Sequence, residues 1–248
     1  MAVTINSSTL SGMILTSDNT GVTILQANTI TSLTADGTGR LVLPALTTLN
    51  TATAGGLEYN NNAIYFTSTG TQRGVIPARQ MFVLNTAYAG ASSTANQSFF
   101  GLTNGVTLAT NTVYAFEAFY ALSKTAGTTS HSFSLLANNG TATFTNIQYH
   151  NLIKYNTTSF VTVPATDSYS AFILTSNPTA ILTTLTSATA SLAILQKGIL
   201  AVNVGGTFLP QYTLSAAPGG GYTTQVGSYM HIYPIAEGTA NVNIGTWS

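Results

Sequence analysis

Apolar and polar residues alternate with a period of two over much of the chain after residue 110, which is the pattern of β-strands. Between Val113 and Leu122 the even positions are Tyr, Phe, Ala, Tyr and Leu. The odd positions of this stretch are also mostly apolar, and Glu117 is the exception. We therefore expect a strand that is covered on both of its faces.

Further strands are predicted where the same alternation recurs. Ser130 to Ala137 alternates up to Asn138-Asn139-Gly140, and Asn-Gly is a strong hairpin signal. Thr179 to Leu195 would also suit a short helix, but its high Thr content favours a strand. The other predicted strands are Phe144 to Tyr155, Ser168 to Thr175, Leu192 to Val204, Thr207 to Ser215 and Val226 to Ile235. Eight or more strands with regular turns predict an antiparallel, jelly-roll-like β-sandwich.

The first 77 residues have a different pattern of apolar and polar residues. Their apolar residues come singly or in short groups, separated by Thr, Asn and Gly, as in Arg40-Leu41-Val42-Leu43. Short strands with so little apolar surface indicate a slender β arm or stalk whose core is completed by other copies of the chain. A disordered tail is the alternative, although the Ile, Leu and Val content is high for disorder. Pro77 marks the joint, so we expect an N-terminal attachment region at 1–77 and a sandwich domain at 78–248.

Composition narrows the classes of partner. Only 5% of the residues are charged, and six acidic residues balance six basic ones, against about 25% charged residues in an ordinary soluble domain. Nucleic acid and anionic membranes attract clustered Lys and Arg, which this chain lacks. There is no cysteine, which removes disulfides and thiolate ligands. No secretory signal or membrane-spanning run is expected.

Catalytic chemistry has few candidate residues. The three histidines share no short spacing and the six carboxylates are far apart in the sequence, so we expect no catalytic residue, no bound metal and no cofactor. His131 and His231 alternate with aromatic residues and are interpreted as hydrogen-bonded, partly buried side chains. Glu117 must be paired or face water, since burying it alone is costly. We expect a structural ion pair with Lys154, with Lys197 and Arg79 as alternatives.

Aromatic residues near the end of the sequence are the candidate contacts for a receptor or glycan. Tyr229 and Tyr233 lie on one face of a predicted strand, and Trp247 follows Asn241-Val242-Asn243-Ile244-Gly245. A tryptophan in this position more often packs against the edge of a domain. The functional alternative is a sugar-stacking platform formed by Trp247 with Tyr229 or Tyr233.

Two stretches of sequence resemble a known group of proteins. The first comprises Gly55-Gly56-Leu57-Glu58-Tyr59, Ala63-Ile64-Tyr65-Phe66-Thr67 and Thr71-Gln72-Arg73-Gly74-Val75-Ile76-Pro77. The second runs from Lys197-Gly198-Ile199-Leu200-Ala201-Val202-Asn203 through Gly206-Thr207-Phe208, Pro210-Gln211 and Ser215-Ala216-Ala217-Pro218-Gly219-Gly220 to Gly245-Thr246-Trp247-Ser248. These pieces resemble the linker and C-terminal domain of tail fibre and minor structural proteins of tailed bacteriophages.

The resemblance implies a non-enzymatic virion protein, commonly a homotrimer, that attaches to other virion proteins through its N-terminal part and projects its β-rich C-terminal part. We therefore expect a tail fibre or similar appendage that binds a glycan or protein of the host surface. The chain is short for a fibre, which keeps a capsid decoration protein, on the outer capsid surface, as the alternative. A glycan hydrolase is the third class, and it would need two of Glu117, Asp167 and Glu237 to meet.

Overall fold

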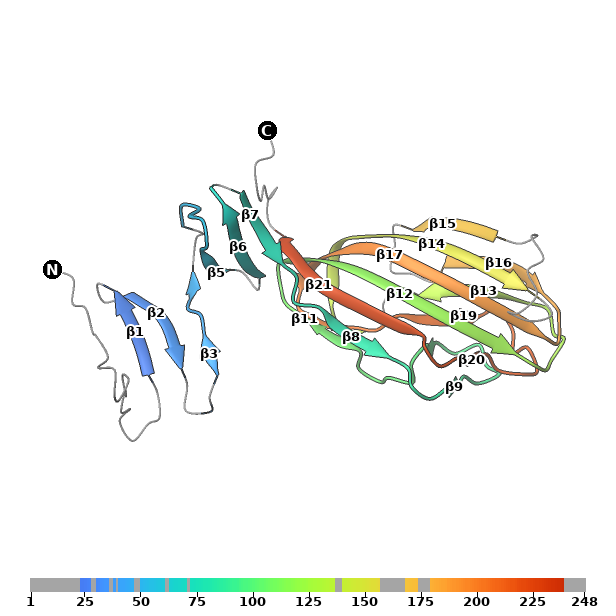
Figure 1. Cartoon of the computed structure of the whole chain (residues 1–248). Coiled ribbons are helices and arrows are strands. Elements are labelled where there is room, and N and C mark those ends of the chain that lie inside the picture. Colours follow the sequence, from blue (N-terminus) through green and yellow to red (C-terminus); the bar gives the residue numbers. More distant parts are fainter. Residues whose placement is uncertain are drawn as a thin grey trace. The chain divides into compact units, whose positions relative to one another are not determined.

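A computed structural model of the chain describes residues 23–27, 30–35, 38, 40–46, 50–60, 63–70, 72–136, 140–156, 168–173 and 179–238. Throughout this part every helix-or-strand element is a β-strand, so the protein is all-β, as the alternation predicts (Figure 1). The chain divides into two compact units, Met1–Gly74 and Val75–Ser248. The joint expected at Pro77 lies a few residues beyond this division.

The N-terminal unit contains two small sheets. One is antiparallel and has the order β1 (Thr23–Ala27), β2 (Ile30–Ala35), β3 (Leu41–Val42). The other has the order β4 (Ala45–Leu46), β5 (Leu57–Asn60), β6 (Ala63–Thr69), β7 (Gln72–Ile76). A turn at Gly55-Gly56 precedes β5. Gly55 has a φ of 81°, which favours glycine, and its N–H donates to the carbonyl of Thr67 at 2.8 Å.

An ion pair ties the second of these sheets together. The guanidinium of Arg73 on β7 lies 2.6 Å from Oε2 of Glu58 on β5, and both side chains are largely buried. Arg73 Nη2 also donates to the carbonyl of Asn50 at 2.6 Å, and the N–H of Asn50 donates to Glu58 Oε1 at 3.0 Å. Glu58 and Arg73 both belong to the linker-like stretch, so its two charged residues hold its strands to the preceding segment.

Few apolar side chains of the N-terminal unit are buried. Where the structure describes its side chains, the buried apolar residues are Ala63 and Tyr65. Leu41 is 69% exposed, and Val42, Leu57 and Phe66 are exposed as well. Within one copy, the described side chains of this unit therefore form too small an apolar core to hold its strands.

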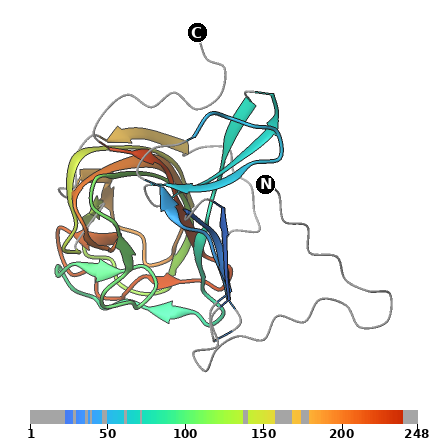
Figure 2. The same cartoon turned by 90° about the vertical axis from the view of Figure 1, so that its left-hand side faces the viewer.

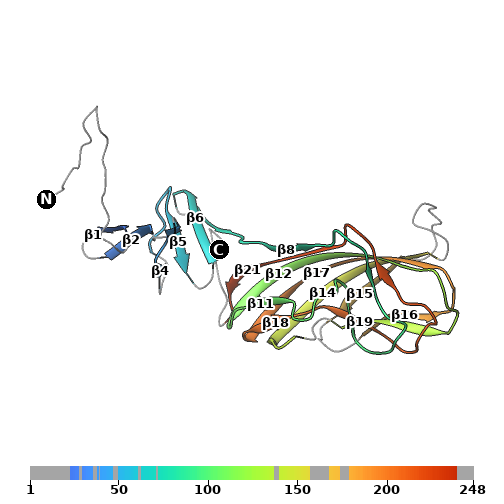
Figure 3. The ribbon, with the colours of Figure 1, turned by 90° about the horizontal axis from the view of Figure 1, so that it is seen from below.

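The C-terminal unit is built on one large antiparallel sheet. Its central strands are β12 (Thr112–Lys124), β14 (Thr143–Asn156) and β17 (Ala190–Val204), with β17 between the other two. Its remaining strands are β15 (Ser168–Ile173) beside β14, β21 (Tyr229–Glu237) and β20 (Thr223–Thr224) beside β12, β8 (Gln80–Val83) beside β21, and β9 (Tyr88–Ala89) beside β20. Figure 3 shows β21, β12, β17 and β14 side by side.

A second, smaller layer faces this sheet. It contains the order β10 (Gln97–Ser98), β19 (Gln211–Leu214), β13 (His131–Leu136), β16 (Thr179–Leu185), together with the pair β11 (Val106–Leu108) and β18 (Gly206–Phe208). Thr179 to Leu195, which also suited a helix, contributes β16 and the start of β17. The strand predicted at Thr207 to Ser215 is two strands, because Leu209-Pro210 separates β18 from β19.

The hairpin predicted at Asn139-Gly140 is wrong. Residues 137–139 lie outside the described part of the chain, but the strands that flank them belong to different sheets. β13 pairs with β16 and β19, whereas β14 pairs with β15 and β17. The connection therefore crosses from one layer to the other, which a turn signal in the sequence does not reveal.

The core lies between the two layers and is rich in aromatic residues. Phe99, which follows β10, stacks on Tyr120 of the large sheet with ring centroids 3.8 Å apart and lies 5.2 Å from Tyr212 of the small sheet. Phe133 also stacks on Tyr212, with ring centroids 4.8 Å apart. Viewed from the end in Figure 2, the C-terminal unit is a curved sandwich whose layers enclose this core. The predicted antiparallel β-sandwich is confirmed.

Candidate functional site

The outer face of the large sheet carries most of the candidate residues. β12 alternates strictly, so Phe116 and Ala118 point into the core and Glu117 points outward between half-buried neighbours. Strand register places Lys197 of β17 directly beside Glu117 on one side and His231 of β21 on the other. The expectation that β12 is covered on both faces is met on one face only: its core face is buried, and its outer face is half-buried.

Glu117 is the polar centre of this face. Its Oε2 lies 2.6 Å from Lys197 Nζ, and its Oε1 accepts a hydrogen bond from the Tyr229 hydroxyl at 2.7 Å. His231 Nε2 lies 3.8 Å from the same Oε1. The hydrogen bond from Lys197, followed by that from Tyr229, lowers the pKa of Glu117, although partial burial opposes this. The hydrogen bond with Glu117 in turn raises the pKa of Tyr229.

The expected pairing of Glu117 with Lys154 is wrong. Lys154 is exposed on β14, where the register sets it beside Ala193. His150 is the residue of β14 that lies at the level of Glu117 and Lys197. Lys154 is four residues further along β14, which places it about 13 Å from that level. Lys197 was one of the alternatives, and it is the partner because it lies opposite Glu117 on the adjacent strand.

Tyr229 and Tyr233 lie in one column on β21. The ring of His231 stands between them, with centroids 6.1 Å from each. The guanidinium of Arg79 lies 5.1 Å from the centre of the Tyr233 ring, and Phe119 lies 6.3 Å from Tyr229. The column is therefore a half-buried aromatic strip. Trp247 lies outside the described residues, so the platform that it would form with Tyr229 or Tyr233 is not tested.

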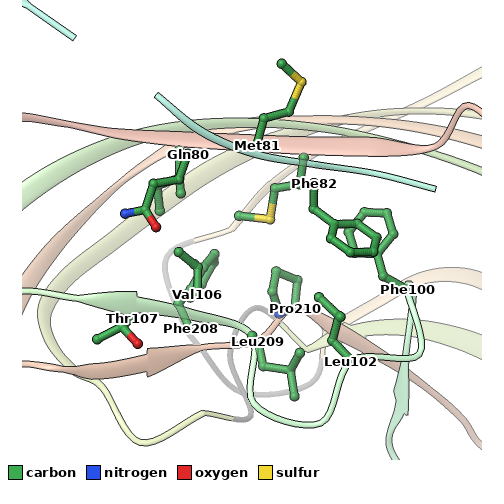
Figure 4. Close-up of a pocket in the computed structure, with 13 residues that line it drawn as sticks. Gln80, Met81, Phe82, Phe100, Leu102, Val106, Thr107, Phe208, Leu209 and Pro210 are labelled. Atoms are coloured by element: carbon green, nitrogen blue, oxygen red, sulfur yellow. The ribbon is translucent and has the colours of Figure 1, made fainter. Parts of the chain in front are cut away.

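An apolar cavity of about 310 Å³ opens between the two layers, beside β8 (Figure 4). Its wall is formed by β8 and β21 on one side. The other side is formed by β11 and the residues that precede it, and by β18 and the residues that follow it. The lining side chains are mainly aliphatic and aromatic: Phe82, Phe100, Leu102, Val106, Phe208, Leu209, Pro210, Met230 and Ile232. Gln80 and Thr107 add polar groups at its edge, while Met81 points away from it. We call it the apolar cavity.

The sequence patterns do not predict the apolar cavity. Its lining comes from four separate stretches of chain, 80–82, 100–107, 208–210 and 230–232. Each stretch alone reads as an ordinary strand or turn. Leu209-Pro210 is the one local sequence signal for the cavity. Proline is unfavourable inside a strand, and these two residues interrupt the predicted strand and line the cavity.

Two buried polar groups are fully occupied by structural contacts. His131 Nδ1 donates to the carbonyl of Thr129 at 2.8 Å, so its Nε2 accepts from the Tyr222 hydroxyl at 2.9 Å. This confirms the interpretation of His131 as a hydrogen-bonded, buried side chain. The ammonium of Lys124 lies within hydrogen-bonding distance of four backbone carbonyls, two of them at 2.6 Å, which more than satisfy its three N–H groups. Burial lowers its pKa.

The described residues contain no group of three or more His, Asp or Glu side chains that could hold a metal ion. Glu237 pairs with Thr112, five residues along β12 from Glu117, so these carboxylates are about 17 Å apart along the strand. Asp167 lies outside the described residues. Nor does the part of the chain that the structure describes include a helix long and apolar enough to span a membrane.

A scan of protein-family models found no match to this chain, and a search of curated proteins found no significant relative.

Proposed function

We propose that this chain is a structural protein of a tailed-bacteriophage virion, a homotrimeric tail fibre or similar appendage that takes part in host adsorption. The observation that carries the proposal is the apolar surface that the N-terminal unit leaves uncovered. Four large apolar side chains of that unit are exposed while Tyr65 is buried. Strands of this kind become stable when copies of the chain pack their apolar side chains against each other.

The outer face of the large sheet supports self-association as well. Leu152, Ile199, Val83 and Met81 are exposed there, beside the aromatic strip. The charge of Glu117 is paired within this face, because Lys197 on the adjacent strand neutralises it. A broad, weakly charged face of this kind resembles the centre of an interface between subunits more than an ordinary protein surface.

In this proposal residues 1–77 attach to other virion proteins and the sandwich domain projects from the particle. Host recognition would use loops and exposed aromatic side chains of the sandwich, on a host-surface glycan or protein. The resemblance in the linker and C-terminal stretches supports this arrangement. The protein would then be assembled in the host cytoplasm and reside in the virion.

A capsid decoration protein is the second candidate. The exposed apolar side chains of the N-terminal unit favour it as well, because another virion protein could cover them in place of further copies of the chain. The N-terminal strands would then add to strands of the capsid surface instead of to one another. The two candidates share the fold and differ in copy number and partner.

Quantitative mass spectrometry of purified particles, together with the intact mass of the recombinant complex, tests the proposal. A stable trimer at low copy number supports the appendage. A copy number on the scale of the capsid subunits moves the protein to the capsid surface. Absence from purified particles would overturn both candidates.

Two substitutions on β6 test the observation itself. Phe66→Lys places a charge in the exposed apolar surface and is expected to shift the trimer towards monomer in native mass spectrometry. Thr69→Lys, at an exposed position on the opposite face of the same strand, is the matched control and is expected to leave the trimer intact. Equal behaviour of the two variants would contradict self-association through this surface.

A further inference from the structure

We propose that the free edge of β8 binds an extended, uncharged segment of another polypeptide, which adds a strand to the large sheet and places one large apolar side chain in the apolar cavity. This inference does not depend on the proposed function. It is based on two separate features, the main-chain groups along β8 and the cavity that opens beside them. In binding by strand addition, main-chain hydrogen bonds supply affinity and pockets for alternate side chains supply specificity.

β8 is an edge strand with unused main-chain groups. Where the structure describes the chain, β8 pairs with β21 on one side and with no strand on the other. The N–H of Leu84, directly after β8, donates to the carbonyl of Ser228 at 2.8 Å and so points towards the β21 side. Main-chain groups in an antiparallel pair point to the two sides alternately, so those of Phe82 face β21. The N–H and C=O groups of Met81 and Val83 therefore face outward and can bond to an added strand.

The edge of β8 lacks the features that usually keep strand edges unpaired. Natural proteins protect exposed edges with charged residues, proline or bulges. None of the four residues of β8 is charged or proline, and all four are exposed. Its register with β21 is regular, without a bulge. The guanidinium of Arg79, the residue before β8, lies 5.1 Å from the centre of the Tyr233 ring. β8 is therefore open to pairing.

The apolar cavity lies at this edge of the sheet. The described residues that line it belong to β8 and β21 but not to β12, the next strand inward. Met81 contributes to the wall although its side chain points away, so the main chain of β8 reaches the cavity (Figure 4). The side chains of an added strand would alternate between the two faces, as those of β8 do. The residue opposite Phe82 would therefore point between the layers, towards the cavity.

The cavity selects the side chain that enters it. An apolar cavity of about 150 Å³ can hold a benzene molecule. The volume of about 310 Å³ therefore has room for one aromatic side chain. None of the residues that line the cavity is charged, and the polar groups of Gln80 and Thr107 lie at its edge. A charged side chain would lose its hydration there without gaining a counter-ion. The side chain that enters is therefore large, neutral and apolar.

The β8 strand of a second copy does not fit this site. Two β8 strands paired antiparallel through Met81 and Val83 would place Phe82 of each copy opposite Phe82 of the other. The Phe82 ring already packs 5.1 Å from the Phe100 ring of its own chain, so it is engaged beside its own cavity. Neither cavity would gain an occupant in such a pair. We therefore assign the edge to a different polypeptide.

Fluorescence anisotropy of a labelled peptide, titrated with the full chain, tests the proposal. The probe is Thr-Val-Thr-Phe-Thr-Val-Thr with fluorescein at its N-terminus, and its phenylalanine is the side chain meant for the cavity. Saturable binding is expected. N-methylation of the two threonines that flank the phenylalanine removes the N–H groups that would face β8, and it should weaken binding about tenfold.

N-methylation of the phenylalanine itself is the matched control. In an antiparallel pair the N–H of this residue faces away from β8, so the affinity should stay close to that of the unmodified probe. Absence of saturable binding would overturn the proposal. Equal affinities of the two N-methylated peptides would overturn it as well.

Variants of the chain test the edge and the cavity separately. Val83→Pro removes an outward N–H and keeps the bonds of β8 to β21, so binding should be lost, whereas Val83→Thr keeps the N–H and should bind as the wild type does. Val106→Phe fills the cavity from β11. The wild type should prefer the probe over a version with alanine in place of phenylalanine by about tenfold, and Val106→Phe should bind both alike.

Met81→Pro and Leu102→Phe repeat these two changes at second positions, and circular dichroism identifies the folded variant of each pair. Full binding by a folded proline variant would overturn the proposal. The same would follow from an unchanged preference for phenylalanine in a folded cavity-filling variant.

Other occupants of the site would give different results. If a second copy used the edge, Val83→Pro would lower the mass of the assembly in native mass spectrometry, which would overturn the assignment to another polypeptide. If the cavity took small apolar molecules in place of a strand, 2-naphthol would bind and the peptide would not, which would also overturn it. An unchanged mass, together with competition between 2-naphthol and the peptide, supports the proposal.

Discussion

Replacing Glu117 by glutamine removes the charge at the centre of the outer face and keeps the size of the side chain. The ion pair with Lys197 is lost, and the hydrogen bond from Tyr229 becomes a bond to a neutral acceptor. An ion pair with an exposed lysine contributes about 0.2–1 kcal/mol, and Lys197 is 62% exposed. A charged acceptor adds about 1 kcal/mol over a neutral one. We expect the free energy of unfolding to fall by about 1–2 kcal/mol, and the Tm by about 2–8 °C for a domain of this size.

The pH dependence of this loss follows from the direction of the pKa shift. The pKa of Glu117 is lower in the folded protein than its ordinary value of 4.5 in the unfolded chain. The stabilisation is therefore complete above about pH 4.5 and is lost as the pH falls through the lower, folded value. Wild type and Glu117→Gln should differ most at neutral pH and converge in acid. Lys197, Tyr229 and His231 are the titratable groups that face position 117 in the wild type and in the variant.

Urea unfolding followed by circular dichroism at neutral and acidic pH is the assay. A double-mutant cycle with Lys197→Met isolates the ion pair, whose coupling energy should decrease at high salt. Lys154→Met is the control for loss of a lysine from the same face of the sheet, and it should change stability by less than about 0.5 kcal/mol. An unfolding difference between wild type and Glu117→Gln that is the same at neutral and acidic pH would refute this reasoning.

Three further predictions concern packing and pairing. Phe99→Ala leaves a cavity between the two layers and should lower the free energy of unfolding by about 3–5 kcal/mol. Phe119→Ala, on the half-buried face, should lower it clearly less, and thermal unfolding compares the two variants. Gly198→Ala places a Cβ against the carbonyl of Gln148 on the adjacent strand. It should destabilise the pairing of β14 with β17, seen as faster hydrogen exchange in these strands. Arg73→Met removes the ion pair with Glu58, so proteolysis of the N-terminal unit should become faster while that of the sandwich stays unchanged. Proteolysis of the N-terminal unit at the wild-type rate would contradict this.

Local pattern predicts most of the strands and not how they pair. The alternation in Val113 to Leu122 and in Leu192 to Val204 identifies β12 and β17, because each strand buries one face and side-chain direction has a period of two. Which strand lies next to which depends on chain crossings between the layers. The Asn139-Gly140 signal failed for this reason, since a turn-forming pair of residues fits a crossover as well as a hairpin.

The candidate site shows the same limit. The sequence identified Glu117 as a carboxylate in need of a partner, because its neighbours are apolar. It could not choose among three basic residues, because the choice depends on register: Lys197 is opposite Glu117, and Lys154 is not. The apolar cavity was missed entirely, because residues from four separate stretches of chain line it.

The register of Glu117 also decides what its face of the sheet can contact. An unpaired carboxylate at the centre of the face would disfavour binding of a partner, since covering it would leave a buried charge without a counter-ion. Here Lys197 and Tyr229 already satisfy both carboxylate oxygens from within the same face. A second copy can therefore cover the part of the face around Glu117 without supplying a charge to it, and the exposed apolar side chains nearby can provide the contact area. For this reason Glu117→Gln should change the stability of the fold more than the association of its copies, whereas Phe119→Ala, which removes contact area, should weaken the association.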